Sequence, residues 1–478
     1  MNKSILKNTF ALFIPNMLNP VISFVLVLVI SRYLGVEGLG QYSLVISYTE
    51  TFAALASMGL GSLIVREAAR NPNETHALFV NSILFGTCAS LLGLVVMNVT
   101  VVTLGYSKDV VHACMVMSFT IALSTATYYA ESVFRAIEKA EYVAVTYLAE
   151  NIARVGACVY LALNGYGIVI IFVAILGSRV FAVGLFSIFY GRVVGIPKWR
   201  FRPDIWRLLG REAPVFASIV IFSTIHLTVD QIMLSKLQDI EAVGIYSAAN
   251  RLLAICKTLP LAFSGALLPF LTREFTRGTP RLQALASRSC KYLFLITFPL
   301  VMGTAILADQ IILLLYGKGF EAAAPVLRLH IVSLIPFSLA YLFAEVLIAT
   351  DNQRFALRLN IIAAVLNVVL NLILIPFLAE MGAVLATLIT IVVFNQVQYQ
   401  YVKSQLFRVR FMELVPKALL AVLVMGVVTY LLRGLNIFAN VAISAGVYFG
   451  LVFALKALAS EEIQFLKGLV RRRGSVPE

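Results

Sequence analysis

The chain has 478 residues, of which 60% are hydrophobic and only 13% are charged, and its mean hydropathy is +0.91. Soluble domains carry about 25% charged residues, so this composition excludes a soluble domain and predicts an integral membrane protein. The five cysteines lie in or beside apolar runs, and we interpret them as packing residues rather than disulfides or metal ligands.

Apolar runs of about 20 residues recur along the whole chain, and each is long enough to cross a bilayer as a helix. The first run is too long for the core of a cleavable signal peptide, so we expect it to remain as a span. The fold class predicted is an all-α integral membrane protein with about fourteen transmembrane helices. The predicted spans are residues 10–31, 40–62, 77–104, 111–133, 143–163, 167–190, 213–234, 243–271, 292–315, 326–349, 356–378, 382–402, 414–432 and 437–458.

The net charge of +14 is distributed unevenly between the two sets of loops. With the amino terminus inside, the inner segments hold most of the Lys and Arg, which is the positive-inside pattern and predicts that both termini are cytoplasmic. The basic excess is therefore a topology signal with some contact to anionic lipids, and we exclude nucleic-acid binding. The inner set includes Arg66, Arg70, Arg135, Lys139, Arg192, Arg200, Arg202, Arg207, Arg211, Arg273, Arg277, Arg281, Arg288, Arg354 and Arg358. The outer loops hold only Arg32, Lys108, Lys236, Lys318, Arg328 and Arg433.

Residues 30–43 and 234–247 are two copies of one segment and align without a gap. The identical pairs are Ser31 and Ser235, Glu37 and Glu241, Gly40 and Gly244, Tyr42 and Tyr246, and Ser43 and Ser247. The register continues downstream with three extra residues, so that 66–70 matches 273–277. Because both motifs recur in the same order, the duplicated unit is a whole lobe, and internal repeats of this kind are typical of secondary transporters.

The repeat predicts four domains. Residues 1–190 form an amino-terminal lobe of six helices, 191–211 an amphipathic cytoplasmic linker, and 212–403 a second six-helix lobe. Residues 404–478 add helices thirteen and fourteen and a basic cytoplasmic tail. An even number of helices in each copy gives both lobes the same orientation, related by a pseudo-two-fold axis along the membrane normal.

Four cations fall inside the predicted spans and are the candidate ligand-binding residues: Arg154, Arg179, Arg251 and Lys257. A charge at membrane depth either lines a water-filled cleft, pairs with a neighbouring charge or extends to the interface. Glu150 and Arg154 lie four residues apart on one helix face, so we expect them to form an ion pair. Arg179 and Lys257 have no acid within helical reach, which favours cavity lining.

Two intramembrane acids, Glu50 and Asp230, are assigned to gating or ion coupling. With the three-residue insertion, Glu50 and Lys257 occupy equivalent positions in the two lobes. Opposite charges at equivalent depths would meet across the cleft in one state and separate in another, and the alternative is that each contacts only its own lobe.

Several segments together resemble the polysaccharide transporter family, the Wzx-type oligosaccharide flippases of the multidrug/oligosaccharidyl-lipid/polysaccharide (MOP) exporter superfamily. They are SRYLGVEGLGQYS, GLGSLIVRE, VDQIMLS with VGIYSAANRL, YGKGFEAAAPVLRL and LNVVLNLILIP, and the resemblance covers essentially the whole chain. It implies a V-shaped pair of lobes around a hydrated cavity, and a flippase that moves polyprenyl-pyrophosphate-linked oligosaccharides across the cytoplasmic (inner) membrane for polysaccharide biosynthesis. The implied partners are this lipid-linked substrate, membrane lipids, and a glycan polymerase or glycosyltransferases.

Other functions stay open at this point. A lipid II flippase and a cation-coupled multidrug exporter share the layout, but an exporter of cations favours an acid-dominated cavity, whereas the buried set here is slightly cationic. A membrane glycan polymerase or ligase needs a large extracytoplasmic loop, and the predicted outer loops are short. Because no nucleotide-binding, zinc-protease or metal motif stands in a loop, we expect no enzyme activity, no cofactor and no metal site.

Overall fold

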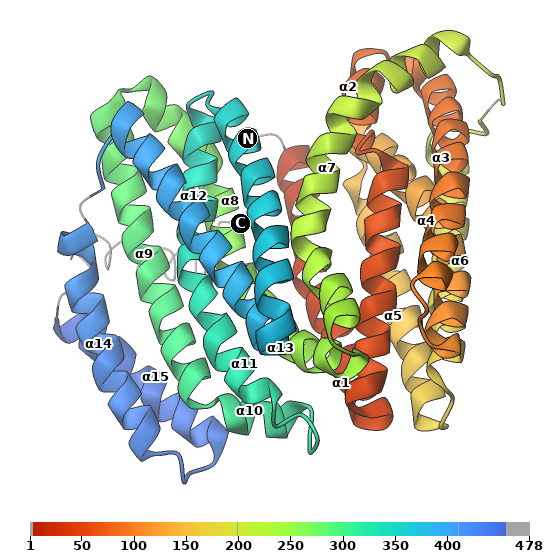
Figure 1. Ribbon diagram of the computed structural model, residues 1–478. Helices are drawn as coiled ribbons and strands as arrows, with labels where there is room; N and C mark the ends of the chain where they lie inside the picture. The colour runs from red at the N-terminus through yellow and green to blue at the C-terminus, as the bar shows by residue number, and fades with distance from the viewer. Residues whose placement is uncertain (1–2, 198, 410, 456–478) are drawn as a thin grey trace, which may run out of the picture. The chain divides into compact units, whose positions relative to one another are not determined.

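The computed structural model describes residues 3–197, 199–409 and 411–455, without the side chains of residues 3–20, 219, 221–223, 225–227 and 412–414 (Figure 1). All the regular secondary structure in these ranges is helix, and short turns and loops join the helices. The helices are α1 (Lys3–Ser57), α2 (Gly61–Arg70), η1 (Pro72–Glu74), α3 (Thr75–Thr103), α4 (Lys108–Ala136), α5 (Ala140–Leu163), α6 (Ile168–Val193), α7 (Pro203–Leu237), α8 (Ile240–Thr276), α9 (Thr279–Ile306), α10 (Ala308–Leu315), α11 (Ala323–His330), η2 (Ile331–Ser333), α12 (Leu334–Ala349), α13 (Gln353–Gln405), α14 (Phe411–Leu431) and α15 (Ile437–Ala454).

Every predicted span contains a helix, so the all-α membrane fold is confirmed. Nine helices of the described residues are long and apolar enough to cross a membrane. Two of them hold two predicted spans each, because α1 and α13 each consist of two helices joined at a non-helical residue, Gly35 and Ala379. The predicted spans 143–163, 213–234 and 414–432, which lie in α5, α7 and α14, fall outside the nine.

The short connectors are set by glycine at helix ends. After α5, Gly165 has a φ of +77°, its N–H donates to the oxygen of Ala162, and the N–H of Tyr166 donates to the oxygen of Leu161. These two bonds form a Schellman motif, which satisfies carbonyls that the helix leaves free and reverses the chain. Residues 164–167 therefore form the short turn between α5 and α6.

The chain divides into two compact units. The first comprises Met1–Arg251, Tyr316–Phe320 and Asn360–Ala383, and the second comprises Leu252–Leu315, Glu321–Leu359 and Val384–Glu478. These units are defined by packing, whereas the lobes 1–190 and 212–403 are defined by sequence repetition and stay a prediction. The predicted basic tail after Leu455 lies outside the described residues.

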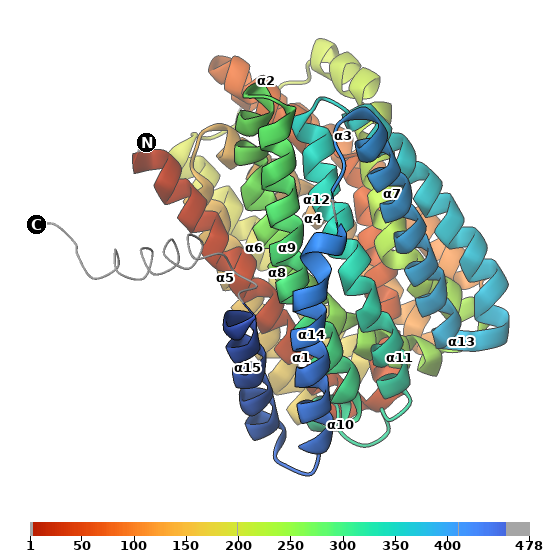
Figure 2. The ribbon, with the colours of Figure 1, turned by 90° about the vertical axis from the view of Figure 1, so that its left-hand side faces the viewer.

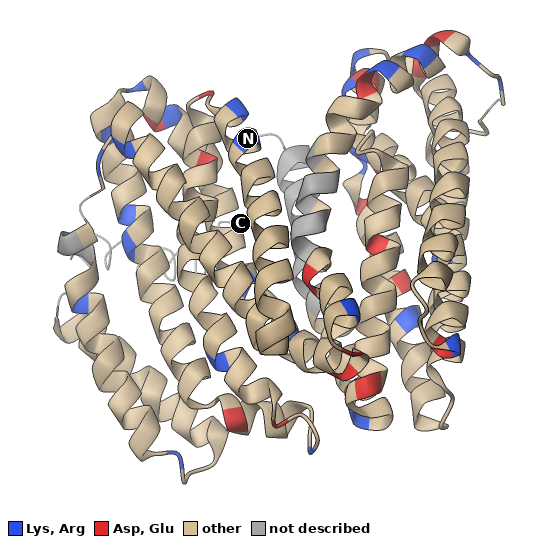
Figure 3. Cartoon of the chain, in the orientation of Figure 1, with Lys and Arg blue, Asp and Glu red and all other residues tan. Residues whose placement is uncertain are grey.

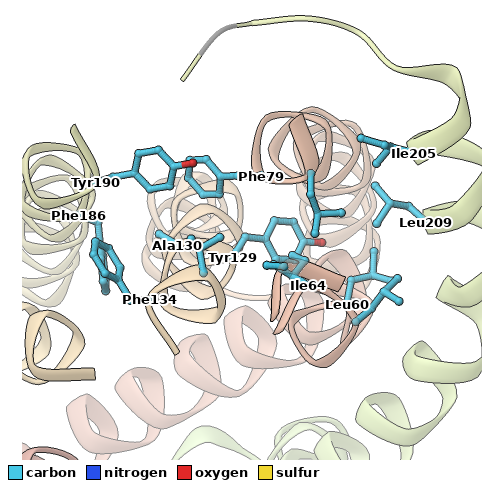
Figure 4. Packing of buried hydrophobic residues seen from close by; sticks show 14 of the residues in the cluster. Leu60, Ile64, Phe79, Tyr129, Ala130, Phe134, Phe186, Tyr190, Ile205 and Leu209 are labelled. Atoms are coloured by element: carbon cyan, nitrogen blue, oxygen red, sulfur yellow. The ribbon is translucent and has the colours of Figure 1, made fainter. Parts of the chain in front are cut away.

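At one end of the first unit, an apolar core joins α2, α3, α4, α6 and the start of α7 (Figure 4). Tyr129 and Phe134 of α4 are fully buried at its centre, and Tyr190 of α6 stacks on Phe79 of α3 with ring centroids 4.3 Å apart. Ile205 and Leu209 of α7 belong to the same core. The last nine residues of the predicted linker 191–211 form the first turns of α7, so this part of the linker is helical and packs on the core.

Charged side chains gather at this same end of the first unit, where α2 and the start of α7 lie (Figure 3). Arg66 pairs with Glu67 and with Glu212 of α7, at 2.9 and 3.7 Å. Arg202 pairs with Asp204 at 2.7 Å and with Glu74 at 3.2 Å, and this guanidinium lowers the pKa of the Asp204 carboxyl to about 2. Predicted inner segments that lie far apart in the sequence thus meet at one end of the unit.

In the second unit, α8, α9, α12 and α13 surround a core that includes Leu293, Phe343 and Val346. Helices α14 and α15 lie side by side, and α14 packs on α9 (Figure 2). Tyr448 of α15 reaches back to donate a hydrogen bond of 2.7 Å to the oxygen of Leu295. The two helices outside the sequence repeat are thus attached to the unit through α9.

The two copies of the repeated segment cross each other at their glycines, within the first unit. A Cβ added to Gly40 would lie 2.0 Å from the backbone oxygen of Ile240, and a Cβ added to Gly244 would lie 2.2 Å from that of Val36. Gly40 aligns with Gly244 and Val36 aligns with Ile240, so each copy makes the same contact with the other. Reciprocal contacts between equivalent residues are the mark of a two-fold relation, which supports the predicted pseudo-symmetry.

Candidate functional site

The ion pair at the centre of the first unit joins α5 to α6. Arg179 Nη1 lies 3.1 Å from Glu150 Oε1 and donates a hydrogen bond of 3.2 Å to Oε2. Glu150 is buried, with 5% of its side chain exposed, whereas Arg179 keeps 26% exposed. The arginine therefore neutralises a buried carboxylate and still presents part of its guanidinium to its surroundings.

The predicted Glu150–Arg154 ion pair is wrong. Arg154 Nη2 donates instead to Asn151 Oδ1 at 2.6 Å and to Ser23 Oγ of α1 at 3.0 Å. The neighbouring helix offers Glu150 a second guanidinium, so the carboxylate pairs across the α5–α6 interface rather than along its own helix face. Arg154 Nε is buried and has no hydrogen-bond partner in the described chain.

Glu50 of α1 lies within electrostatic range of the same two arginines. Arg251, Arg179 and Arg154 all act electrostatically on its carboxylate, and Arg251 has the largest effect. Glu50 is exposed, and the three arginines are half-buried. The structure thus brings together four of the six predicted site residues, which the sequence had placed on four different helices.

We call this group the arginine cluster: Glu50, Glu150, Arg154, Arg179 and Arg251. Three positive and two negative charges leave it with a formal charge of +1. Tyr42, stacked on Phe172 with centroids 5.9 Å apart, lies close enough for Arg154, Arg251 and Glu50 to act on it electrostatically. A cationic group of this kind, half-buried and partly neutralised, suits an anion that shares its charge with several guanidiniums.

Asp230 of α7 lies in a separate polar group with Tyr246, Asn367 and Asn371, which we call the Asp230 network. Its carboxylate, 5% exposed, accepts hydrogen bonds from the Tyr246 hydroxyl at 2.7 Å and from Asn371 Nδ2 at 2.6 Å. Asn371 Nδ2 also donates to Asn367 Oδ1 at 3.3 Å, so Asn371 links Asn367, one turn away on α13, to Asp230. Both of these donors are neutral, whereas Glu150 is paired with a guanidinium.

Polar contacts between α1 and α7 were not predicted. Ser47 donates a hydrogen bond to Gln231, and the hydroxyls of Thr51 and Thr228 lie 2.8 Å apart. The signal present in the sequence was the spacing of Ser47 and Thr51 by four residues within an apolar run, which places both hydroxyls on one helix face. Hydrogen bonds of this kind hold helices together inside a membrane.

Lys257 belongs to the second unit, and its Nζ lies 4.7 Å from the centre of the Phe337 ring of α12. This is a cation–π contact. Glu50 belongs to the first unit, so the predicted meeting of Lys257 and Glu50 stays a prediction. In the described residues no three His, Cys, Asp or Glu side chains gather where they could hold a metal ion.

Residues 5–275, more than half of the chain, match the family model described as polysaccharide biosynthesis protein, and residues 214–373 match the MatE model. The chain is 26% identical over 322 residues to the succinoglycan biosynthesis transport protein ExoT of Rhizobium meliloti. It is 26% identical over 163 residues to the probable low-salt glycan biosynthesis flippase Agl15 of Haloferax volcanii, and 33% over 143 residues to the lipid II flippase MurJ of Bacillus subtilis.

These three matches cover 64%, 34% and 29% of this chain, in that order. They span 62%, 34% and 26% of the relatives themselves, which is less than two thirds of each.

Among solved structures, the chain superposes on lipid II flippase MurJ in an inward closed conformation with a TM-score of 0.80, covering 94% of this chain and 99% of that one at 16% identity. A multidrug resistance MATE family transporter in its inward-facing conformation superposes with a TM-score of 0.65, at 84% and 98% coverage and 16% identity. At these identities the likeness establishes the transporter fold, and it leaves the substrate to be argued from the site.

Proposed function

Because this chain belongs to the polysaccharide biosynthesis protein family, we propose that it is a flippase that moves a polyprenyl-pyrophosphate-linked oligosaccharide across the membrane. The observation that carries the proposal is the convergence of Arg154, Arg179 and Arg251 beside Glu50. Relatives named as glycan flippases and as a succinoglycan transport protein support the same class of substrate.

The chemistry of the substrate explains why such a cluster is useful. A diphosphate carries its charge on several oxygens, and planar guanidiniums bind such oxygens in pairs. The half-buried guanidiniums of Arg154 and Arg251 supply donors, while Arg179 is held in place by Glu150. Because Glu50 and Glu150 offset part of the positive charge, the diphosphate is held weakly enough to leave on the other side. The polyprenyl tail stays in the lipid.

Alternating access requires parts of the protein that move or change partners when the substrate binds. In this proposal the lobes 1–190 and 212–403 move relative to each other about the linker 191–211, while 404–478 follows the second lobe. Glu50 and Lys257 form the gate, and Asp230 binds the coupling cation or proton. Single charge reversal at either gate residue abolishes transport, and the exchange Glu50→Lys with Lys257→Glu restores part of it. Losses that simply add in the exchanged variant would remove the gate from the proposal.

In this proposal the arginine-rich end of the first unit, with α2 and the start of α7, lies on the cytoplasmic side of the inner membrane. Both termini are then cytoplasmic. The partners are the lipid-linked glycan, surrounding membrane lipids, and glycosyltransferases or a glycan polymerase that act before and after translocation.

A drug exporter is the second candidate, favoured by the match of residues 214–373 to the MatE model. Exporters of organic cations need a binding site dominated by acids, whereas the arginine cluster has a formal charge of +1. An uptake assay with a cationic dye separates the two functions, because the flippase proposal predicts no dye gradient across proteoliposomes.

The flippase proposal is tested by glycan export in cells that depend on this protein. Glu150→Gln/Arg179→Gln and Lys257→Ala are expected to abolish export at normal abundance in the membrane, because a cation kept at membrane depth is usually kept for function. The paired substitution leaves no buried carboxylate without a partner. The matched control is Lys318→Ala, which removes an exposed loop cation and is expected to export normally. Normal export by both test variants would contradict the proposal.

A further inference from the structure

A basic pocket lies in the second unit, at the hairpin that joins the end of α8 to the start of α9. It has a volume of about 300 Å³ and is lined by Phe270, Arg273 and Glu274 from α8 and by Arg281, Ala284, Leu285 and Arg288 from α9. Arg281 and Arg288 are seven residues apart, which is about two helical turns, so they share one face of α9. Arg273 adds a third guanidinium and lies 5.6 Å from the ring centre of Phe270.

The positive charge of this pocket is largely unmatched. Glu274 is 3.6 Å from Arg273 and 2.9 Å from Arg277, so one carboxylate serves two arginines. Neither Arg281 nor Arg288 forms an ion pair or hydrogen bond with any part of the chain that the structure describes. Several uncommitted guanidinium donors therefore converge on one concave site.

The equivalent motif of the first repeat shows that this imbalance is particular to the second copy. Arg66-Glu67 aligns with Arg273-Glu274, but Arg66 also reaches Glu212 of α7 at 3.7 Å. No residue of the described chain supplies a second acid of this kind to Arg273. The first copy is neutralised by the protein itself, and the second copy is left for an external anion.

We infer that the α8–α9 pocket binds a phosphate group. Arginine forks recognise phosphate oxygens in pairs, and Phe270, which is 50% exposed, gives the pocket one apolar side. The two available sources are the headgroup of an anionic phospholipid and free inorganic phosphate. A basic pocket between helices at the positively charged side of a membrane protein favours the lipid headgroup.

The test uses the purified full-length chain and measures lipid binding by native mass spectrometry. Phosphatidylglycerol is the anionic probe, and phosphatidylcholine is the zwitterionic comparison. The double variant Arg281→Gln/Arg288→Gln is expected to raise the dissociation constant for phosphatidylglycerol by about tenfold or more, since each lost charge-assisted bond is worth about that factor. The matched control Arg354→Gln/Arg358→Gln removes the same charge from two exposed positions of the same unit and is expected to change it less than about twofold.

Inorganic phosphate identifies the source. If millimolar phosphate raises the melting temperature of the wild-type chain but not that of the pocket variant, and phosphatidylglycerol is not retained, the ligand is free phosphate. Retention of phosphatidylglycerol through the pocket arginines assigns the lipid headgroup. Equal weakening in both double variants, or no binding of either probe, overturns the inference. The test requires no transport, so its outcome is independent of the flippase proposal.

Discussion

Tyr42 and Tyr246 occupy equivalent positions in the two copies of the repeat, yet their electrostatic surroundings differ in sign. Tyr42 stacks on Phe172 and lies near Arg154 and Arg251. Tyr246 donates a hydrogen bond of 2.7 Å to the buried carboxylate of Asp230. Both tyrosines belong to the first unit and both are buried, at 7% and 2% exposure, so the difference lies in their neighbours rather than in their depth.

The origin of this difference is a single alignment column. When the gap-free alignment is extended four residues upstream, Leu26 falls opposite Asp230. Leu26 is fully buried and offers no acceptor, so the first tyrosine has no carboxylate to bind at that position. The duplication kept the backbone crossing at the two glycines, while the two copies acquired different polar neighbours: arginines near Tyr42 in the first copy, and the carboxylate of Asp230 beside Tyr246 in the second.

The feature common to both copies, the glycine crossing, is expected to give the largest effect. Gly40→Ala and Gly244→Ala each place a Cβ about 2 Å from a backbone oxygen of the other copy, so the helices must separate. Each is expected to lower the free energy of unfolding by about 3 kcal/mol, at the upper end of the overpacking range. Gly177→Ala in α6 is the control, because its added Cβ has no neighbour within 4 Å, and it is expected to be neutral or slightly stabilising. Thermal unfolding in detergent measures the stability of all three variants. A Gly40→Ala variant as stable as wild type would contradict the close approach of the two copies at this glycine.

A smaller effect is expected from removing the tyrosine hydroxyls. This pair of variants tests directly whether the two copies have different polar surroundings. Tyr246→Phe removes a hydrogen bond to a buried carboxylate and is expected to cost about 2 kcal/mol. Tyr42→Phe retains the stacking on Phe172 and is expected to cost less than about 0.5 kcal/mol. Equal losses in the two variants, measured by the same unfolding assay, would mean that the two copies do not differ as described.

The fold was largely predictable because each helix is specified locally. Apolar runs of membrane-spanning length and a turn such as Asn164-Gly165 act over a few residues, and the sequence shows them directly. Each of α1 and α13 is two helices joined at a non-helical residue, Gly35 and Ala379, and both residues fall between predicted spans.

The sequence predicted which residues contribute to the site but not which of them contact each other. The sequence placed Glu50, Arg154, Arg179 and Arg251 inside spans, but which helix faces meet depends on packing between elements. Glu150 and Arg179 are 29 residues apart and Asp230 and Asn371 are 141 apart, so neither contact follows from helical spacing. The local rule of four-residue spacing favoured Glu150–Arg154, and it failed because a second arginine on α6 was closer.

The central claim is that the arginine cluster binds the diphosphate of the substrate. The most direct measurement is the affinity of the purified chain in nanodiscs for a polyprenyl-pyrophosphate-linked glycan, compared between wild type and Glu150→Gln/Arg179→Gln. This double variant removes one negative and one positive charge, so no buried carboxylate is left unpaired and the fold is retained. The account predicts an unchanged melting temperature and a loss of affinity of about tenfold or more, while Asp230→Asn binds the glycan like wild type. Wild-type affinity in the double variant would contradict it, because Arg179 would then serve only to neutralise Glu150.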